Sequence, residues 1–176
     1  MRLTVYTDYS LRVLMFLAVR GEELATIAEI AKAYGISKNH LMKVAHQLGL
    51  AGYVETVRGK GGGLRLARRP QDIVLGDVVR RTEPDMALVP CFDLDDVSCA
   101  IFPGCVLRGV LGDARDAFLT VLDRHSLADL VRSRASLQRA LVFKANALAA
   151  ARQPGRRAQA RSSASLPRRR SAHHEA

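Results

Sequence analysis

The chain has 176 residues, of which 48% are hydrophobic and 5% are aromatic, with no tryptophan. This length suits one domain, or one domain plus an appendage. No stretch approaches the ~18 apolar residues of a membrane span and no secretory signal pattern opens the sequence, so we expect a cytoplasmic protein. The net charge of +10 divides into +6 for residues 1–69, −2 for 70–151 and +6 for 152–176. A basic folded segment favours a nucleic-acid partner, although a merely solvated basic surface would have the same composition.

A first helix is predicted to begin at a cap, Thr7 or Asp8, and to run to about Arg20. Gly21 then ends it, because glycine tolerates the backbone conformation of a helix stop. Its apolar residues recur at helical spacing and form the expected buried stripe: Leu11, Leu14, Met15 and Ala18.

Two short capped helices follow, joined by a tight glycine turn. Thr26-Ile-Ala-Glu29 has the capping-box pattern, and Gly35 ends the second helix. Ser37 is predicted to cap a third helix that reaches about Ala51, with inward side chains at Leu41, Val44, Ala45 and Leu48. This pair predicts a helix-turn-helix, in which the third helix is the recognition helix.

The first two turns of that helix carry polar side chains away from the apolar stripe: Ser37, Lys38, Asn39, His40 and Lys43. Residues at this end of a recognition helix reach base edges. Asparagine can bond adenine with two hydrogen bonds, and lysine can reach guanine or phosphate. The set predicts a DNA-reading face, and the alternative is an ordinary polar helix surface.

A glycine-rich segment, residues 58–63, separates strand patterns at 53–57 and 64–66, and this predicts a hairpin wing. Its tip carries Arg58 and Lys60, which suits contact with phosphate or the minor groove. A nucleotide-binding P-loop would need Lys-Ser/Thr opening a helix. Here Gly61 follows Lys60 and the chain enters a strand, so the sequence disfavours that alternative.

Helices are also predicted at 75–81, at about 105–123 and from a cap at Ser126. The second of these has nearly heptad apolar spacing, which favours dimerisation over packing within its own chain. The fold is predicted to be mainly α, a winged helix-turn-helix DNA-binding domain plus a long dimerisation helix. We divide the chain into that DNA-binding domain (1–82), a connector and cysteine loop (83–105), dimerisation helices (106–150) and a disordered basic tail (151–176).

All three cysteines, Cys91, Cys99 and Cys105, lie within fifteen residues. An odd number would leave one thiol outside any closed set of disulfides. The spacing does not fit a zinc knuckle, but thiolates can hold an iron–sulfur cluster, for which a fourth ligand must lie elsewhere. The alternatives are three unrelated small hydrophobic residues, a redox sensor that uses bare thiols, and a nucleophilic cysteine assisted by His125.

Several segments taken together resemble a family of iron–sulfur transcription regulators, which contains the nitric-oxide-sensing NsrR-type repressors and the cluster-assembly IscR-type regulators. They are the opening residues 1–12, the segments 34–43 and 51–63, the Cys-x7-Cys-x5-Cys loop and Leu127-Ala-Asp-Leu130. The resemblance covers about residues 1–145 and leaves the basic tail outside.

This resemblance implies a homodimeric repressor that binds an inverted-repeat operator in double-stranded DNA while its cluster is intact, and releases detoxification genes when nitric oxide attacks the cluster. It implies cluster ligation by Cys91, Cys99 and Cys105, with Asp8 of the other subunit as fourth ligand unless Asp8 only caps its helix. IscR-type proteins instead place a histidine ligand three residues after the last cysteine. Arg108 stands there and has no lone pair to offer, so NsrR is favoured. A cluster-status or thiol-redox regulator of the IscR type is the alternative, and either [4Fe–4S] or [2Fe–2S] is compatible with the ligand set.

Overall fold

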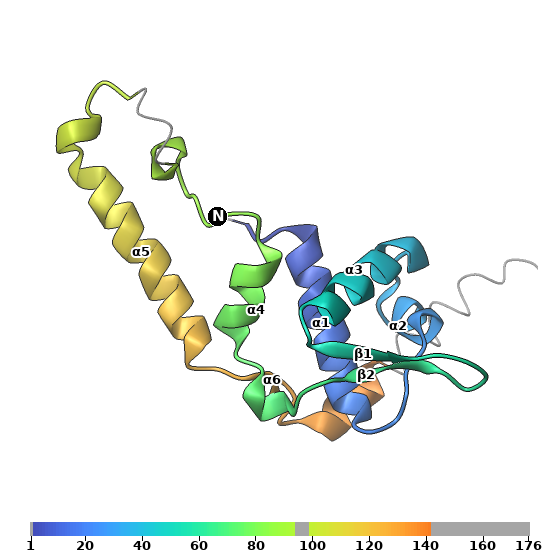
Figure 1. The fold of residues 1–176 in the computed structure, drawn as a ribbon. Helices are drawn as coiled ribbons and strands as arrows, with labels where there is room; N and C mark the ends of the chain where they lie inside the picture. The colour runs from blue at the N-terminus through green and yellow to red at the C-terminus, as the bar shows by residue number, and fades with distance from the viewer. Residues whose placement is uncertain (1, 94–98, 142–176) are drawn as a thin grey trace, which may run out of the picture.

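The computed structural model describes residues 2–93 and 99–141 (Figure 1). The predicted basic tail therefore lies outside the described residues. The winged part comprises α1 (Val5–Arg20), α2 (Ile27–Tyr34), α3 (Lys38–Leu50), β1 (Val54–Val57) and β2 (Gly63–Leu66). It continues through η1 (Pro70–Asp72), α4 (Leu75–Thr82), η2 (Pro90–Phe92), η3 (Phe102–Gly104), α5 (Val106–Asp123) and α6 (Leu127–Leu130), and residues 134–141 are again helical.

Helix α1 forms the centre of the core, and most of its second half is buried, including Val13, Leu14 and Leu17 at 0% exposure. It begins earlier than the sequence indicated. Thr4, rather than Thr7 or Asp8, is the N-cap, and its hydroxyl accepts a bond from the Thr7 amide at 3.2 Å. Thr7 is itself buried and donates its hydroxyl to Thr82 Oγ1 at 2.9 Å, which ties α1 to α4.

The helix-turn-helix matches its prediction closely. The Thr26 hydroxyl accepts from the Glu29 amide and the Glu29 carboxylate accepts from the Thr26 amide at 2.7 Å. That backbone bond is the main cause of the lowered pKa of Glu29. Gly35 has φ 70° and ψ 29°, a left-handed turn that other residues rarely adopt. Ser37 occupies the N-cap position of α3, but its hydroxyl makes no capping bond, which corrects that part of the prediction.

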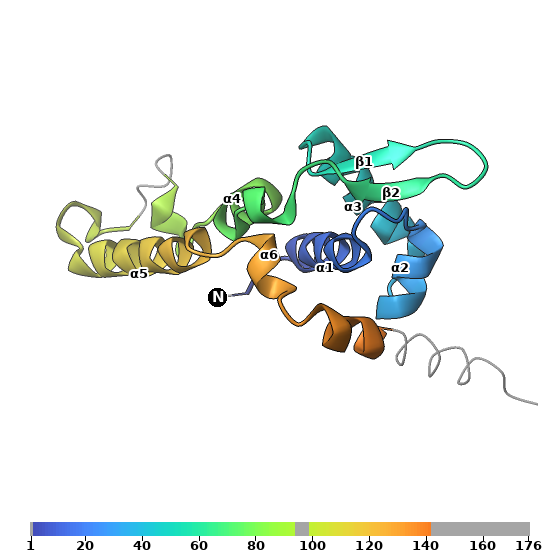
Figure 2. The same ribbon diagram turned by 90° about the horizontal axis from the view of Figure 1, so that it is seen from below.

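The wing is an antiparallel pair of strands, with Val54 opposite Leu66 and Val57 opposite Gly63. Leu64 also exchanges two backbone bonds with Ala25 at 2.8 and 2.9 Å, so the hairpin is anchored to the segment that precedes α2. In both views the hairpin tip projects beyond the helices (Figures 1 and 2).

Helix α5 lies at the end of the molecule that is opposite to the wing (Figures 1 and 2). It packs against α4, where Arg80 donates two bonds to the Asp123 carboxylate at 2.7 and 2.6 Å. Gly76 leaves room for this bridge, because a Cβ there would lie 1.8 Å from Asp123 Oδ1. The chain then returns through α6 and buries Leu127 in the winged-helix core. None of the helices in the described part of the chain is long and apolar enough to cross a membrane.

Candidate DNA-binding surface and cysteine centre

All five polar residues predicted on the recognition helix are exposed, while the apolar side of α3 is buried. The His40 ring lies 6.3 Å from the ring of Tyr9 on α1, so this side chain leans on the neighbouring helix. The other four are exposed around the start of α3: Ser37, Lys38, Asn39 and Lys43. The fold thus presents the side chains that could meet base edges.

The basic residues of the wing fall into two groups. Arg58 and Lys60 are exposed at the tip. Behind them, Arg65 forms an ion pair with Glu55, and Arg68 donates to the Gly52 carbonyl at 2.9 Å. The second pair holds the hairpin and its base, whereas the first pair is placed to reach a polyanion.

The three cysteines occupy separate turns between α4 and α5. Cys91 lies in η2, Cys99 precedes η3, and Cys105 is the N-cap residue of α5. All three are free thiols; Cys99 is exposed and the others are partly buried. Among residues 2–93 and 99–141 no group of three or more His, Cys, Asp or Glu side chains is close enough to hold a metal, so the thiols stand near one another in sequence without forming a preassembled cage.

Arg108 on the first turns of α5 contacts two of these turns. Its Nε donates to the Cys91 carbonyl at 3.0 Å, and its guanidinium carbon lies 5.0 Å from the centre of the Phe102 ring. From the sequence, Arg108 could only be excluded as a ligand, and nothing in its spacing predicted these contacts. The contact with Cys91 requires segments seventeen residues apart to meet, which only the tertiary structure shows.

Asp8, the predicted fourth ligand, lies in the first turn of α1, and its side chain is 46% exposed. Because Thr4 takes the capping role, Asp8 is not the helix cap. Its carboxylate accepts from Arg12 Nε at 2.9 Å, and the Arg12 guanidinium lies 5.8 Å from the ring centre of Tyr34, the last residue of α2. The four-residue spacing of Asp8 and Arg12 is a pattern from which this pair could have been predicted.

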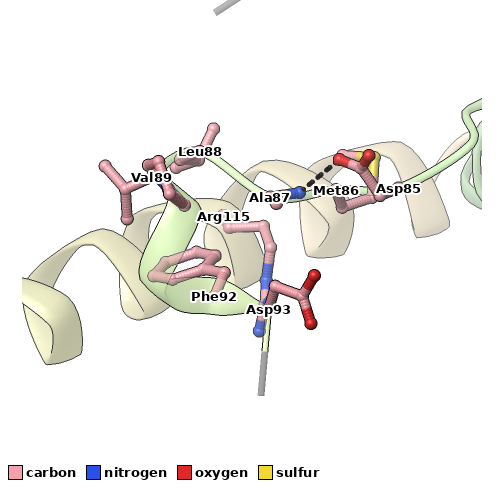
Figure 3. A pocket seen from close by; sticks show the side chains of 9 residues that line it. Asp85, Met86, Ala87, Leu88, Val89, Phe92, Asp93 and Arg115 are labelled. Carbon is pink, nitrogen blue, oxygen red and sulfur yellow. Dashed lines mark hydrogen bonds between the residues drawn. The ribbon is translucent and has the colours of Figure 1, made fainter. Parts of the chain in front are cut away.

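A hollow opens between the connector and α5, beside the first cysteine (Figure 3). The Phe92 ring lies against Arg115, whose guanidinium carbon is 5.1 Å from the ring centre. Asp85 closes a small turn at the other side by accepting from the Ala87 amide at 2.9 Å. The η2 turn that carries Cys91 is therefore seated on α5 by two arginines, Arg108 and Arg115.

A family model described as Rrf2, iron-dependent transcriptional regulator, matches residues 3–133. This chain belongs to the Rrf2 family. The transcriptional regulator NsrR of Bacillus subtilis is 54% identical over 145 residues, which cover 82% of this chain and 99% of that protein. NsrR of Geobacillus kaustophilus is 52% identical over 139 residues, covering 78% and 95%.

Solved structures of the family share the fold. The global cysteine regulator CymR of B. subtilis superposes with a TM-score of 0.62 at 27% identity, covering 76% of this chain and 98% of that one. IscR of T. potens superposes with a TM-score of 0.62 at 28% identity, covering 76% of this chain and 88% of that one. These Rrf2 relatives confirm the winged-helix fold class and the predicted resemblance to NsrR and IscR. They also confirm that the protein is a transcriptional regulator and not an enzyme, which removes the nucleophilic-cysteine alternative.

Proposed function

We propose that this Rrf2-family regulator is a homodimeric, cytoplasmic repressor that senses nitric oxide through an iron–sulfur cluster and binds an inverted-repeat operator while the cluster is intact. One observation carries the proposal. Three free thiols lie between the winged helix and the long helix α5, in a chain 54% identical to a regulator named NsrR. A change of ligation at that point would act on the connection between the DNA-reading part and α5.

The donor set suits iron and sulfide. Thiolates are the usual ligands of iron–sulfur clusters, and all three thiols here are at least partly accessible. Cys91, Cys99 and Cys105 would hold the cluster, with Asp8 of the partner subunit as fourth ligand. A carboxylate binds iron less firmly than a thiolate does, so Asp8 would be the ligand released first. Either [4Fe–4S] or [2Fe–2S] fits these four donors.

When bound, the cluster would supply iron atoms that nitric oxide can attack. This chain's own residues would carry the consequence to the DNA. A ligand role for Asp8 competes with its ion pair to Arg12, and Arg12 lies over Tyr34 at the end of α2. Gain or loss of that role would therefore change a contact between α1 and the helix-turn-helix.

Dimerisation would occur along α5. No residue of this helix, all of which the structure describes, is buried, and four of its apolar side chains are more than half exposed: Val106, Leu107, Val110 and Val121. A second copy of α5 would cover them. Two recognition helices held about 34 Å apart could then read successive major grooves of an inverted repeat.

We propose the corresponding division of the chain: the winged helix-turn-helix in residues 1–82, the connector and cluster loop in 83–105, and the dimerisation helices in 106–150. DNA contacts are assigned to the start of α3 and to the wing tip: Ser37, Lys38, Asn39, His40, Lys43, Arg58 and Lys60. Their exposure and the basic charge of this part of the chain support the assignment.

A second candidate is a regulator of cluster status or thiol redox state that is not specific for nitric oxide. The exposed thiol of Cys99 favours it, because an accessible thiol can be oxidised without any cluster.

Anaerobic purification followed by iron and sulfide counting and visible absorption spectroscopy distinguishes the two. We expect iron, sulfide and a thiolate-to-iron absorption band in the wild type, and their loss in Cys99→Ala. A colourless wild-type protein whose DNA affinity follows thiol oxidation would contradict the proposal and support the second candidate.

A further inference from the structure

The three cysteine-bearing turns share one contact residue on α5. Arg108 reaches the first turn through its bond to the Cys91 carbonyl. It reaches the second through Phe102, whose amide donates to the Cys99 carbonyl at 3.0 Å. It is fixed to the third by the chain itself, since Cys105 is the N-cap of the same helix.

We propose that Arg108 is the positioning residue of the cysteine centre, a clamp that holds the backbones of the Cys91, Cys99 and Cys105 turns against α5. This inference rests on the proposed function for its purpose, but its geometry does not depend on a cluster being bound. Arg108 cannot itself ligate iron, because guanidinium has no free lone pair. It acts through the residues that do.

Arginine suits this position for a physical reason. Its planar group presents several N–H donors, so one can bond a carbonyl while the face of the group stacks on an aromatic ring. Arg108 donates its Nε–H to Cys91 while its guanidinium carbon lies over the Phe102 ring, and the side chain is partly buried, where both contacts are stronger than in open water. Lysine could make either contact but not both.

The positive charge of Arg108 would also offset the negative charge of the cluster ligands. Three thiolates and a carboxylate bring four negative charges to the ligand set, and Arg108 is a permanent cation next to two of the turns that carry them. Arg115 lies seven residues further along α5, on the same side of the helix, and contacts the Cys91 turn through the ring of Phe92.

The test uses the full chain in two states. In the first, Arg108→Gln, Arg108→Lys and Phe102→Leu are loaded anaerobically, and iron release to a chelator is followed with time. We expect Arg108→Gln to lose iron about thirtyfold faster than wild type, which is the size of one charged hydrogen bond plus one cation–π contact at the low end of their range. Arg108→Lys and Phe102→Leu should lie between the two.

Arg124→Gln is the matched control, because Arg124 is exposed just past the end of α5 and its loss changes the charge by the same amount. It should release iron at the wild-type rate. Equal rates for Arg108→Gln and Arg124→Gln would overturn the clamp.

The second state is the protein without iron, with Cys99 and Cys105 replaced by serine so that only Cys91 reacts with an alkylating reagent. Arg108→Gln should raise the alkylation rate of Cys91 about tenfold, since the Cys91 turn loses the charged hydrogen bond to its carbonyl. Circular dichroism confirms that the fold is retained. If Arg108→Gln leaves the alkylation rate of Cys91 unchanged, the clamp is refuted, even if the wild type binds a cluster. If the wild type binds no iron but Arg108→Gln still raises the alkylation rate, only the proposed function is refuted.

Discussion

At the scale of single residues, Asp8 and the wing cations illustrate how neighbours decide a role. Asp8 could have been a helix cap, but Thr4 takes that position and leaves its carboxylate paired with Arg12 on the exposed side of α1. On the wing, Arg65 and Arg68 are engaged by the protein, whereas Arg58 and Lys60 stand at the tip. The side chains available to an outside partner are those that the fold itself does not use.

Replacing Arg58 or Lys60 with glutamine should weaken binding to all DNA sequences alike. Each change should reduce the slope of log affinity against log salt by about one, because one phosphate contact is lost. The measurement is fluorescence anisotropy over a salt series, on an operator fragment and on random DNA. Arg132→Gln is the control, since Arg132 pairs with Asp129 near α6. An equal change of slope in the control would contradict the assignment of the wing tip.

At the scale of elements, the structure distinguishes two helix starts that look alike in sequence. The Thr26 hydroxyl and the Glu29 carboxylate complete a capping box at α2, but the Ser37 hydroxyl caps nothing at α3. An N-cap serine or threonine contributes stability only when its oxygen accepts a backbone N–H. Ser37 is therefore available for a contact outside the chain, as expected for a residue at the start of a recognition helix.

Thr26→Ala should lower the free energy of unfolding by about 1 kcal/mol, because the Glu29 amide loses its side-chain acceptor. Ser37→Ala should leave it nearly unchanged and should reduce operator binding instead. Urea denaturation measures the first effect and anisotropy the second. A stability loss in Ser37→Ala equal to that in Thr26→Ala would mean that the hydroxyl does cap α3 in solution.

The capping box at α6 gives a pH dependence. The Ser126 amide, and then Arg132, lower the pKa of Asp129 from 3.8 to about 2. A carboxyl whose pKa is lowered on folding stabilises the native state above its unfolded pKa and loses that effect as the pH falls through the folded value. Asp129→Asn should therefore be less stable than wild type at pH 7, and the difference should shrink between about pH 4 and pH 2. Urea unfolding at several pH values tests this, and a constant difference down to pH 2 would contradict it.

Most elements could be predicted from local signals, because periodic apolar residues, Thr26-Ile-Ala-Glu29 and the glycines at 35 and 61–63 act over a few residues. The contacts of Arg108 with Cys91 and Phe102 could not, since they depend on where the connector folds back on α5. The burial of Leu127 in the winged-helix core was likewise beyond reach, because it is set by backbone bonds joining Leu75 to His125 and Leu127 to Ile73. For the cysteines, the spacing supports a hypothesis about the chemistry but does not give the arrangement of the thiols.

At the scale of the whole molecule, the wing and α5 lie at opposite ends, with the cysteine turns at the end of α5 remote from the winged core (Figures 1 and 2). The bidentate Arg80–Asp123 bridge and the return of α6 to the core fix the base of α5 to the winged part. A change at the cysteine centre would thus act on one end of α5, whose other end is joined to the DNA-reading part. Pairing of α5 with its copy in a second chain would set the distance between the two recognition helices.

Val110→Asp should weaken self-association by more than about tenfold, because the carboxylate would be unpaired within an apolar contact. Folding should be unaffected, since Val110 is 56% exposed in the single chain. Sedimentation over a concentration series is the measurement. Leu50→Asp, a change at a residue that is 71% exposed at the end of α3, should leave association as in wild type. Dimers of equal strength in Val110→Asp and wild type would place the interface elsewhere.

The central claim is that an intact cluster on Cys91, Cys99 and Cys105 is required for DNA binding and that nitric oxide abolishes it. The most direct measurement is the operator affinity of anaerobic, cluster-loaded protein before and after titration with nitric oxide, on a fragment recovered by binding selection. For the operator to change from almost fully bound to almost fully free, the binding free energies of the intact and nitric-oxide-treated protein must differ by about 5 kcal/mol. We predict that the operator affinity of the wild type falls in proportion to the nitric oxide added per cluster. The Cys99→Ala variant should bind the operator weakly at every point of the titration. Unchanged affinity after titration, or wild-type affinity in Cys99→Ala, would contradict the account.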